Sequence, residues 1–173
     1  TEQIENSDEI VKEIFITKDD IKKYRLWKEQ NARCLYTGKS IRITDLFNTN
    51  IVDFEHTIPR SKSFDNSLAN LTVCYANYNR SIKRNRIPAE LENYENDWNG
   101  YSAIKPRLEP WQNKIDNIEK QLDFWKWKAK TAIDLEKKNT AIVEKHIRLE
   151  ELKYWKNKVD RFTRKDIPQG FIN

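Results

Sequence analysis

The sequence predicts an α+β fold that is mostly helical, with a small strand–strand–helix (ββα) core and an added helical hairpin. Two short runs of strand-forming residues, 51–58 and 71–75, are separated by a polar loop and followed by a helix-forming segment. In the second half, apolar residues recur at steps of three and four, which predicts two amphipathic helices. Two such helices that face each other form a hairpin.

A helix is expected from Thr17 to about Gln30, because Thr17 is a favourable N-cap and two aspartates follow it in the first turn. A one-turn helix capped by Thr44 is expected over 44–47. The segment after the second strand should form a helix that ends near Pro88. The apolar side chains that we expect the first helix to bury are Ile21, Tyr24 and Trp27.

The hairpin should begin near Pro110, since proline is favoured at the first position of a helix. Its second helix should run from about Asn139 to Phe162, with His146 packed or half-exposed. The aromatic run at 124–127 could stack on the bases of a single strand, but its place in the apolar stripe favours the core. The residues expected to face the core are Trp111, Ile115, Ile118, Leu122, Trp125, Ile142, Leu149, Leu152, Trp155, Val159 and Phe162.

Length and composition restrict the class of protein. With 173 residues, the chain fits one domain of ordinary size with a real core. The net charge of +5 is compatible with a polyanionic partner such as nucleic acid. No apolar run is long enough to span a membrane, so no membrane partner is expected. The sequence contains no methionine, and we therefore expect a piece cut from a larger protein.

The two cysteines, Cys34 and Cys74, are far apart in the chain and form no C-x-x-C pair. Zinc is therefore not expected, because structural zinc sites use closely spaced cysteines. A disulfide would need an oxidising compartment, of which the sequence gives no sign. Both cysteines are expected to be small, buried, apolar residues.

Asp53, Glu55 and His56 lie close together in the first predicted strand. Residues two apart share a face of a strand, so Asp53 and Glu55 should lie together and His56 should point away. For Glu55 and His56 to meet one substrate, the strand must bend or bulge close to Pro59, where its ladder ends. The sequence predicts this departure from a regular strand.

Asn77, Asn79 and Arg80 lie at the start of the next helix, whose N-terminal N–H groups favour phosphate. Carboxylate and amide oxygens suit Mg²⁺, which keeps several waters and takes further oxygens from a substrate phosphate. A histidine beside such a site would be a general base, and the expected chemistry is phosphodiester hydrolysis. Taken singly, His56 could equally be a packed residue and Asn77 a helix cap.

The segments CLYTGKSI and VDFEHTIPRSKSFDNSLANLTVCYANYNRSIKRNR resemble an HNH nuclease of the ββα-metal type. More closely, they resemble the HNH domain of the RNA-guided DNA endonuclease of type II CRISPR systems, of the II-C kind. The segments TKDDIKKYRLWKEQNARCLYTGK and YWKNKVDRFTRKDIPQGFIN resemble the linkers that flank that domain. The resemblance implies an incoming linker and helix over 1–30, the HNH core over 31–105, the hairpin over 106–165 and an exit linker over 166–173.

The resemblance implies a role for each residue of the motif and Mg²⁺ as the cofactor, with Mn²⁺ as a substitute. Most family members have aspartate where this chain has Glu55, so the glutamate departs from the pattern. The implied roles are general base for His56, metal ligand for Glu55, Asn79 and Asp53, and a brace of the histidine loop for Asn70.

The implied reaction is one-metal hydrolysis of the DNA strand that is paired with the guide RNA, which leaves 3′-hydroxyl and 5′-phosphate ends. The implied partners are this target strand, the remaining domains of the parent effector and, indirectly, the guide RNA, in the bacterial cytoplasm. Basic residues around the motif are candidates for phosphate contacts, which position a substrate without reading its sequence. They are Arg60, Lys62, Arg80, Lys83, Arg84 and Arg86.

Two alternatives stay open. A free-standing HNH endonuclease of the restriction or homing kind would carry the same motif but would not need the linker-like ends. A non-catalytic nucleic-acid-binding module would need Glu55, His56 and Asn79 to be vestigial, and only Glu55 departs from the family pattern.

Overall fold

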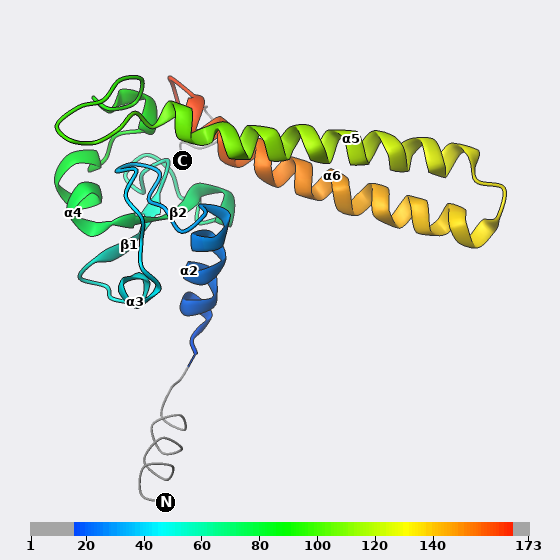
Figure 1. The fold of residues 1–173 in the computed structure, drawn as a ribbon, viewed down its shortest axis with the longest axis horizontal. Helices are drawn as coiled ribbons and strands as arrows, with labels where there is room; N and C mark the ends of the chain where they lie inside the picture. Colours follow the sequence, from blue (N-terminus) through cyan, green and yellow to red (C-terminus); the bar gives the residue numbers. More distant parts are fainter. Residues whose placement is uncertain (1–15, 168–173) are drawn as a thin grey trace, which may run out of the picture.

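The computed structural model describes residues 16–167 and confirms the predicted class, a largely helical α+β fold with a small two-stranded sheet (Figure 1). The predicted incoming segment at 1–15 and the end of the predicted exit linker, 168–173, lie outside the described residues. The helices and strands are α2 (Lys18–Glu29), α3 (Ile43–Leu46), β1 (Val52–His56), β2 (Leu71–Tyr75), α4 (Ala76–Tyr78), α5 (Glu109–Thr131) and α6 (Leu135–Thr163).

The start of α2 follows the prediction, and that of α3 does not. Thr17 Oγ1 accepts a hydrogen bond from the Asp20 N–H at 3.1 Å, and the Asp20 carboxylate accepts one from the Thr17 N–H at 3.0 Å. These reciprocal bonds form a capping box, which satisfies N–H groups that a helix start leaves free. In α3 the N-cap is Arg42 and not Thr44, and its side chain makes no capping bond.

The buried face of α2 differs from the predicted stripe. Ile21 is 60% exposed and Tyr24 is 42% exposed, whereas Lys23 and Leu26 are buried. The Lys23 ammonium lies 5.4 Å from the ring centroid of Phe54 in β1, so its apolar stem packs inward while its charge meets an aromatic face. The prediction held for Trp27, which packs against the core, and failed for Ile21 and Tyr24, because a lysine took a core position that the periodicity gave to apolar residues.

β1 and β2 form a regular antiparallel pair. The register runs without interruption from Val52 opposite Tyr75 to His56 opposite Leu71. The bend or bulge predicted near Glu55 and His56 is therefore absent from the described ladder, and that prediction was wrong. The chain turns only after His56, in the loop that leads to the short 3₁₀ turn Leu68–Asn70 before β2.

The helix predicted after β2 is short and irregular. α4 passes into one π-helical turn over Asn79–Lys83, and the chain then leaves the helix at Arg84. Arg84 has φ 53°, in the left-handed region that ends helices. A separate 3₁₀ turn over Pro88–Glu90 follows, so the single helix predicted up to Pro88 is replaced by three short pieces.

α5 and α6 form the predicted hairpin, whose far half extends away from the rest of the molecule (Figure 1). Pro110 lies in the first turn of α5, as expected. α6 begins at Leu135, four residues before the predicted start, after Asp134 as N-cap. His146 is exposed, in contrast to the packed or half-exposed position expected for it.

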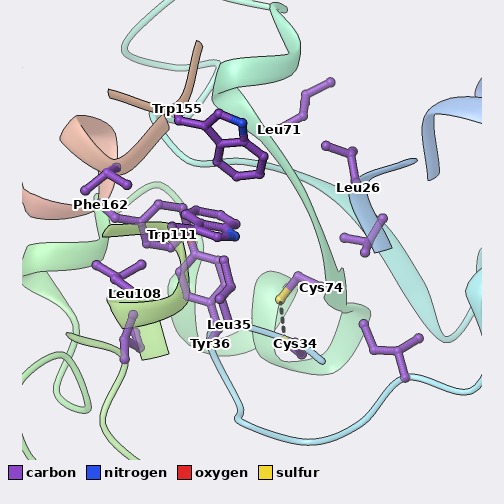
Figure 2. Close-up of a cluster of buried hydrophobic side chains, with 14 of the residues drawn as sticks. Leu26, Cys34, Leu35, Tyr36, Leu71, Cys74, Leu108, Trp111, Trp155 and Phe162 are labelled. Atoms are coloured by element: carbon purple, nitrogen blue, oxygen red, sulfur yellow. Dashed lines mark hydrogen bonds between the residues drawn. The ribbon is translucent and has the colours of Figure 1, made fainter. Parts of the chain in front are cut away.

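The core lies where the near end of the hairpin meets the sheet (Figure 2). Trp111 of α5 and Phe162 of α6 have ring centroids 5.7 Å apart, and Trp111 Nε1 donates to the Glu29 carbonyl at 2.8 Å. Cys34 and Cys74 are buried and free, with their sulfurs 3.7 Å apart, which confirms their predicted role as small core residues. Between residues 16 and 167, the longer helices all lack the apolar stretch that crossing a bilayer requires.

Candidate active site

His56, the last residue of β1, points into a shallow pocket that Phe54, Asn66 and Leu71 help to line. Arg60 Nε lies 3.3 Å from His56 Nε2, and a guanidinium N–H can only donate. The other contact of Nε2 is the side-chain oxygen of Asn66 at 3.0 Å, which can only accept, so the tautomer of the ring decides which of the two hydrogen bonds forms. His56 lies at the surface of this pocket, where a ring nitrogen without a proton is the group that a general base needs.

Asp53 meets the turn that follows β2. Its Oδ2 accepts a hydrogen bond from Asn79 Nδ2 at 3.0 Å, and Arg80 pairs with both of its oxygens, at 2.6 and 3.1 Å. The Arg80 side chain is largely exposed, so this ion pair contributes little to stability and can open at small cost. The structure therefore brings Asp53, Asn79 and Arg80 together, as the predicted site requires.

Glu55 lies in a closed network and is 0% exposed. Its Oε1 accepts a hydrogen bond from Tyr36 at 2.7 Å and pairs with Lys83 Nζ at 3.1 Å. Its Oε2 accepts hydrogen bonds from Thr72 at 2.5 Å and from Thr57 at 3.4 Å. Burial, followed by the Glu55 charge, raises the pKa of Tyr36 well above its ordinary value, so the phenol keeps the proton that it donates. The two oxygens of Glu55 thus have four donors and no free lone pair.

The structure does not bring the Glu55 and His56 side chains together. Because β1 is regular, the Glu55 side chain shares a face with Asp53, below the turn Asn79–Lys83, while the His56 ring lies on the other face with Phe54. The prediction that Glu55 and His56 meet one substrate therefore does not hold for this arrangement. Lys83 connects the two only through the backbone, since its Nζ also donates to the His56 carbonyl at 2.9 Å.

The oxygen donors of the site fit magnesium in part. Across residues 16–167, no group of three or more His, Cys, Asp or Glu side chains is arranged to hold a metal ion. A carboxylate and an amide oxygen from Asp53 and Asn79 nevertheless suit Mg²⁺, which takes few protein ligands and fills the rest with water and phosphate oxygens. Glu55 does not fit this role here, because every oxygen lone pair is used inside the core. Of the three predicted metal ligands, Asp53 and Asn79 are the two whose side chains meet, through the amide N–H of Asn79.

Asn70 ties down the loop that follows His56. It is fully buried, its Oδ1 accepts from the Ile58 N–H at 2.8 Å, and its Nδ2 donates to the carbonyls of Ile58 at 3.1 Å and Asp65 at 2.8 Å. These bonds replace the ladder that ends at His56, so they fix the direction in which the chain leaves the strand.

Replacing Asn70 with alanine is expected to lower the free energy of unfolding by about 2–3 kcal/mol, because it leaves buried groups of Ile58 and Asp65 without partners. Urea unfolding measures this loss. Asn77→Ala removes the same atoms from an exposed position and should change stability by less than about 0.5 kcal/mol. Equal effects of the two substitutions would contradict the bracing role.

The six predicted phosphate contacts differ in how available they are. Lys83 is 1% exposed and is used by Glu55 and the His56 carbonyl, so its assignment as a phosphate contact was wrong. Lys62 and Arg86 pair with Glu90 and Glu92, at 3.7 and 2.8 Å. The side chains that stay exposed are those of Arg60, Arg80 and Arg84.

The sequence did not point to three residues of the site, Thr72, Tyr36 and Asn66, and it predicted a different role for Lys83, that of a phosphate contact. Thr72 could have been found, because it lies directly opposite Glu55 in the strand register. Tyr36 and Lys83 reach Glu55 from segments whose placement depends on the tertiary fold, and Asn66 reaches His56 from an irregular loop. No local pattern signals these contacts.

Comparison with known proteins identifies the segment that holds these residues. Residues 34–89, which include both strands and the turn after them, match a family model described as HNH endonuclease. The chain carries an HNH endonuclease domain. This HNH domain resembles that of Cas9 proteins, and its function class is therefore nuclease.

The relatives are much longer than the chain. CRISPR-associated endonuclease Cas9 1 of Streptococcus thermophilus is 45% identical over 78 residues, which cover 44% of this chain and 7% of that protein. CRISPR-associated endonuclease Cas9 of Campylobacter jejuni is 37% identical over 75 residues, which cover 43% of this chain and 8% of that protein. A crystal structure of S. thermophilus Cas9 in complex with the GGAA PAM has a TM-score of 0.46 and 27% identity, covering 79% of this chain and 12% of that one. The chain thus spans less than a tenth of the curated relatives' length.

Proposed function

We propose that this HNH domain hydrolyses phosphodiester bonds of the DNA strand paired with a guide RNA, within a larger RNA-guided effector in the bacterial cytoplasm. The observation that carries the proposal is the position of His56 in a surface pocket of the matched segment. The similarity to Cas9 proteins supports the substrate class, because in such effectors base pairing with the guide selects the sequence.

Each residue of the candidate site has its own role in the proposed reaction. His56 takes a proton from water, and the resulting hydroxide attacks the phosphorus. The bond to the 3′-oxygen breaks, and this oxygen takes a proton from water, which leaves 5′-phosphate and 3′-hydroxyl ends. Because the His56 ring and Asp53 lie on opposite faces of β1, the ring must turn away from Asn66 and Arg60 when substrate binds. Catalytic hydrogen bonds are often loose without substrate and tighten in the complex. Arg60 then becomes free to contact a phosphate.

Asp53 and Asn79 are the residues that would hold the magnesium ion. The ion would stabilise negative charge on the phosphate and leaving oxygens. Arg80 lies on the same carboxylate and holds it in place until a cation replaces it. Glu55 acts at a distance from the reacting atoms, by anchoring Lys83 below the end of β1.

The function is tested with the whole effector, its guide and a duplex in which each strand carries a different label. The guide-paired strand should be cut by this domain only when Mg²⁺ is present, and Mn²⁺ should substitute for it. The products should accept ligation without added kinase, because they carry 5′-phosphates. Cutting that persists in EDTA would overturn the metal-dependent reaction.

Replacing Asn79 with alanine is expected to raise the Mg²⁺ concentration for half-maximal cleavage about tenfold or more, since losing even an outer partner of a metal site costs that much. Magnesium titration of the cleavage rate measures the shift. Asn77→Ala, an exposed neighbour on the same short helix, is the control and should leave the titration unchanged. An unaltered requirement in Asn79→Ala would remove Asn79 from the metal set.

A non-catalytic nucleic-acid-binding module is the second candidate. One observation favours it, namely that Glu55 and His56 lie on opposite faces of an unbroken strand. The same two-label assay separates the candidates, because such a module would leave the guide-paired strand uncut by this domain at any metal concentration.

A further inference from the structure

Two aromatic side chains near the far end of α5 lie in solvent. Phe124 is 49% exposed and Trp127 is 58% exposed, although the sequence pattern placed both in the core. They are one helical turn apart and their ring centroids are 6.2 Å apart, so they form one continuous aromatic surface. We call this pair, with the lysines described below, the outer strip of α5.

The outer strip faces away from α6. The residues of α5 that are buried lie at Trp111, Ile118, Leu122 and Ala129, on the face that packs against α6. Phe124 and Trp127 occupy the opposite face of the same helix, because a helix turns by 3.6 residues. The two rings therefore add little to the packing of the hairpin, and their exposure needs another reason.

The charge around the two rings is strongly positive. Between residues 120 and 131 the chain has four lysines and a single acid, Asp123. None of these lysines is in an ion pair with another residue of the described part of the chain, 16–167. Their ammonium groups are therefore free to meet an anionic partner. The lysines are Lys120, Lys126, Lys128 and Lys130.

The position of the strip gives it access to a large partner. Phe124 lies 13 residues beyond Trp111, which is about 20 Å further along the helix. Figure 1 shows that this part of the hairpin extends beyond the compact part of the fold, with only α6 beside it. A long molecule can therefore pass over the strip without meeting the HNH core.

We propose that the outer strip binds single-stranded nucleic acid, with bases stacked on Phe124 and Trp127 and phosphates held by the lysines. Aromatic faces bind bases of any sequence, and lysines beside them neutralise the backbone, which is the combination that single-strand-binding surfaces use. An apolar protein partner would not need four lysines, and a duplex would not offer free base faces. The proposal does not rest on cleavage by the HNH site.

Binding is measured by fluorescence anisotropy of labelled single-stranded DNA and RNA of one mixed sequence, in EDTA so that cleavage cannot occur. The chain should bind both single strands, and the double variant Phe124→Ala/Trp127→Ala should bind about tenfold or more weakly. Trp127→Phe in the otherwise unchanged chain should retain most of the affinity, because it keeps a ring. Circular dichroism checks that each variant is folded, which exposed positions should allow.

The matched control lies on the second helix of the hairpin. Val143→Ala/Ile147→Ala truncates two apolar side chains of similar fractional exposure on α6 without removing a ring, and should leave the affinity unchanged. Failure to bind both the DNA and the RNA single strand, an unchanged affinity in the aromatic variant, or an equal loss in the control would each overturn the proposal. The aromatic variant should lose no affinity for a duplex of the same sequence, because a duplex cannot stack its bases on the rings. A loss of affinity for duplex as large as the loss for single strands would also overturn the proposal. Binding of only DNA or only RNA would support it and identify the source.

Discussion

His56→Ala is expected to lower the rate at which the guide-paired DNA strand is cut by about 10²- to 10⁴-fold, the usual contribution of a general base. The physical reason is that the substitution removes the imidazole, the group proposed to take the proton from water. The measurement is single-turnover cleavage by the whole effector at saturating Mg²⁺. Cutting of the other DNA strand should be unchanged.

The control for this substitution is His146→Ala. His146 is the second histidine of the chain, lies exposed on α6 and belongs to no cluster of acids, so its loss should leave both strands cut at the original rates. The His56 variant should also unfold at the same urea concentration as the parent, because its ring is not part of the core. Full retention of the cut on the guide-paired strand in His56→Ala would end the assignment of His56 as the base.

Lys83→Met is expected to lower the free energy of unfolding by about 3–5 kcal/mol, the cost of removing one partner of a buried ion pair. Glu55 would remain in the core with its charge facing only hydroxyl donors, because both side chains are excluded from water. The His56 carbonyl would also lose its hydrogen bond. Urea unfolding at neutral pH measures the loss.

Two further variants isolate the cause. In Glu55→Gln/Lys83→Met both charges are gone, so most of the lost stability should return. Lys62→Met breaks a half-exposed pair with Glu90 and should cost less than about 1 kcal/mol. If Lys83→Met were no more costly than Lys62→Met, the pair with Glu55 would not be the anchor that we describe.

The two halves of the fold differed in how well periodicity predicted them. In α6 the predicted residues Leu152, Trp155 and Phe162 are buried, because a long helix that packs along one side shows its face in its spacing. In α5 the same rule placed Phe124 in the core, and it was wrong. At the far end of the hairpin only α6 lies beside α5, so only one face of α5 is covered there. Apolar residues outside that face, such as Phe124, are therefore exposed.

The residues of the candidate site also differed in how well the sequence predicted them. The motif residues Asp53, Asn70 and Asn79 could be found from the sequence, since strand, loop and helix start follow one another closely in the chain. The position of the Glu55 carboxylate could not be predicted from the sequence. Whether its carboxylate faces a metal or the interior depends on Tyr36 and Lys83, which reach it from other segments.

The sequence by itself determined the class of the fold and the ββα unit with its hairpin, because these depend on local propensity and on short spacings. It also determined the segment that carries the HNH motif, through the resemblance of that segment to a known family. Only the tertiary structure decided that β1 stays regular through His56, that Lys83 is a core residue, and that Phe124 and Trp127 face solvent. The physical reason is that the burial of a residue depends on which residue of another segment packs against it. Neither the alternation of a strand nor the periodicity of a helix specifies that neighbour.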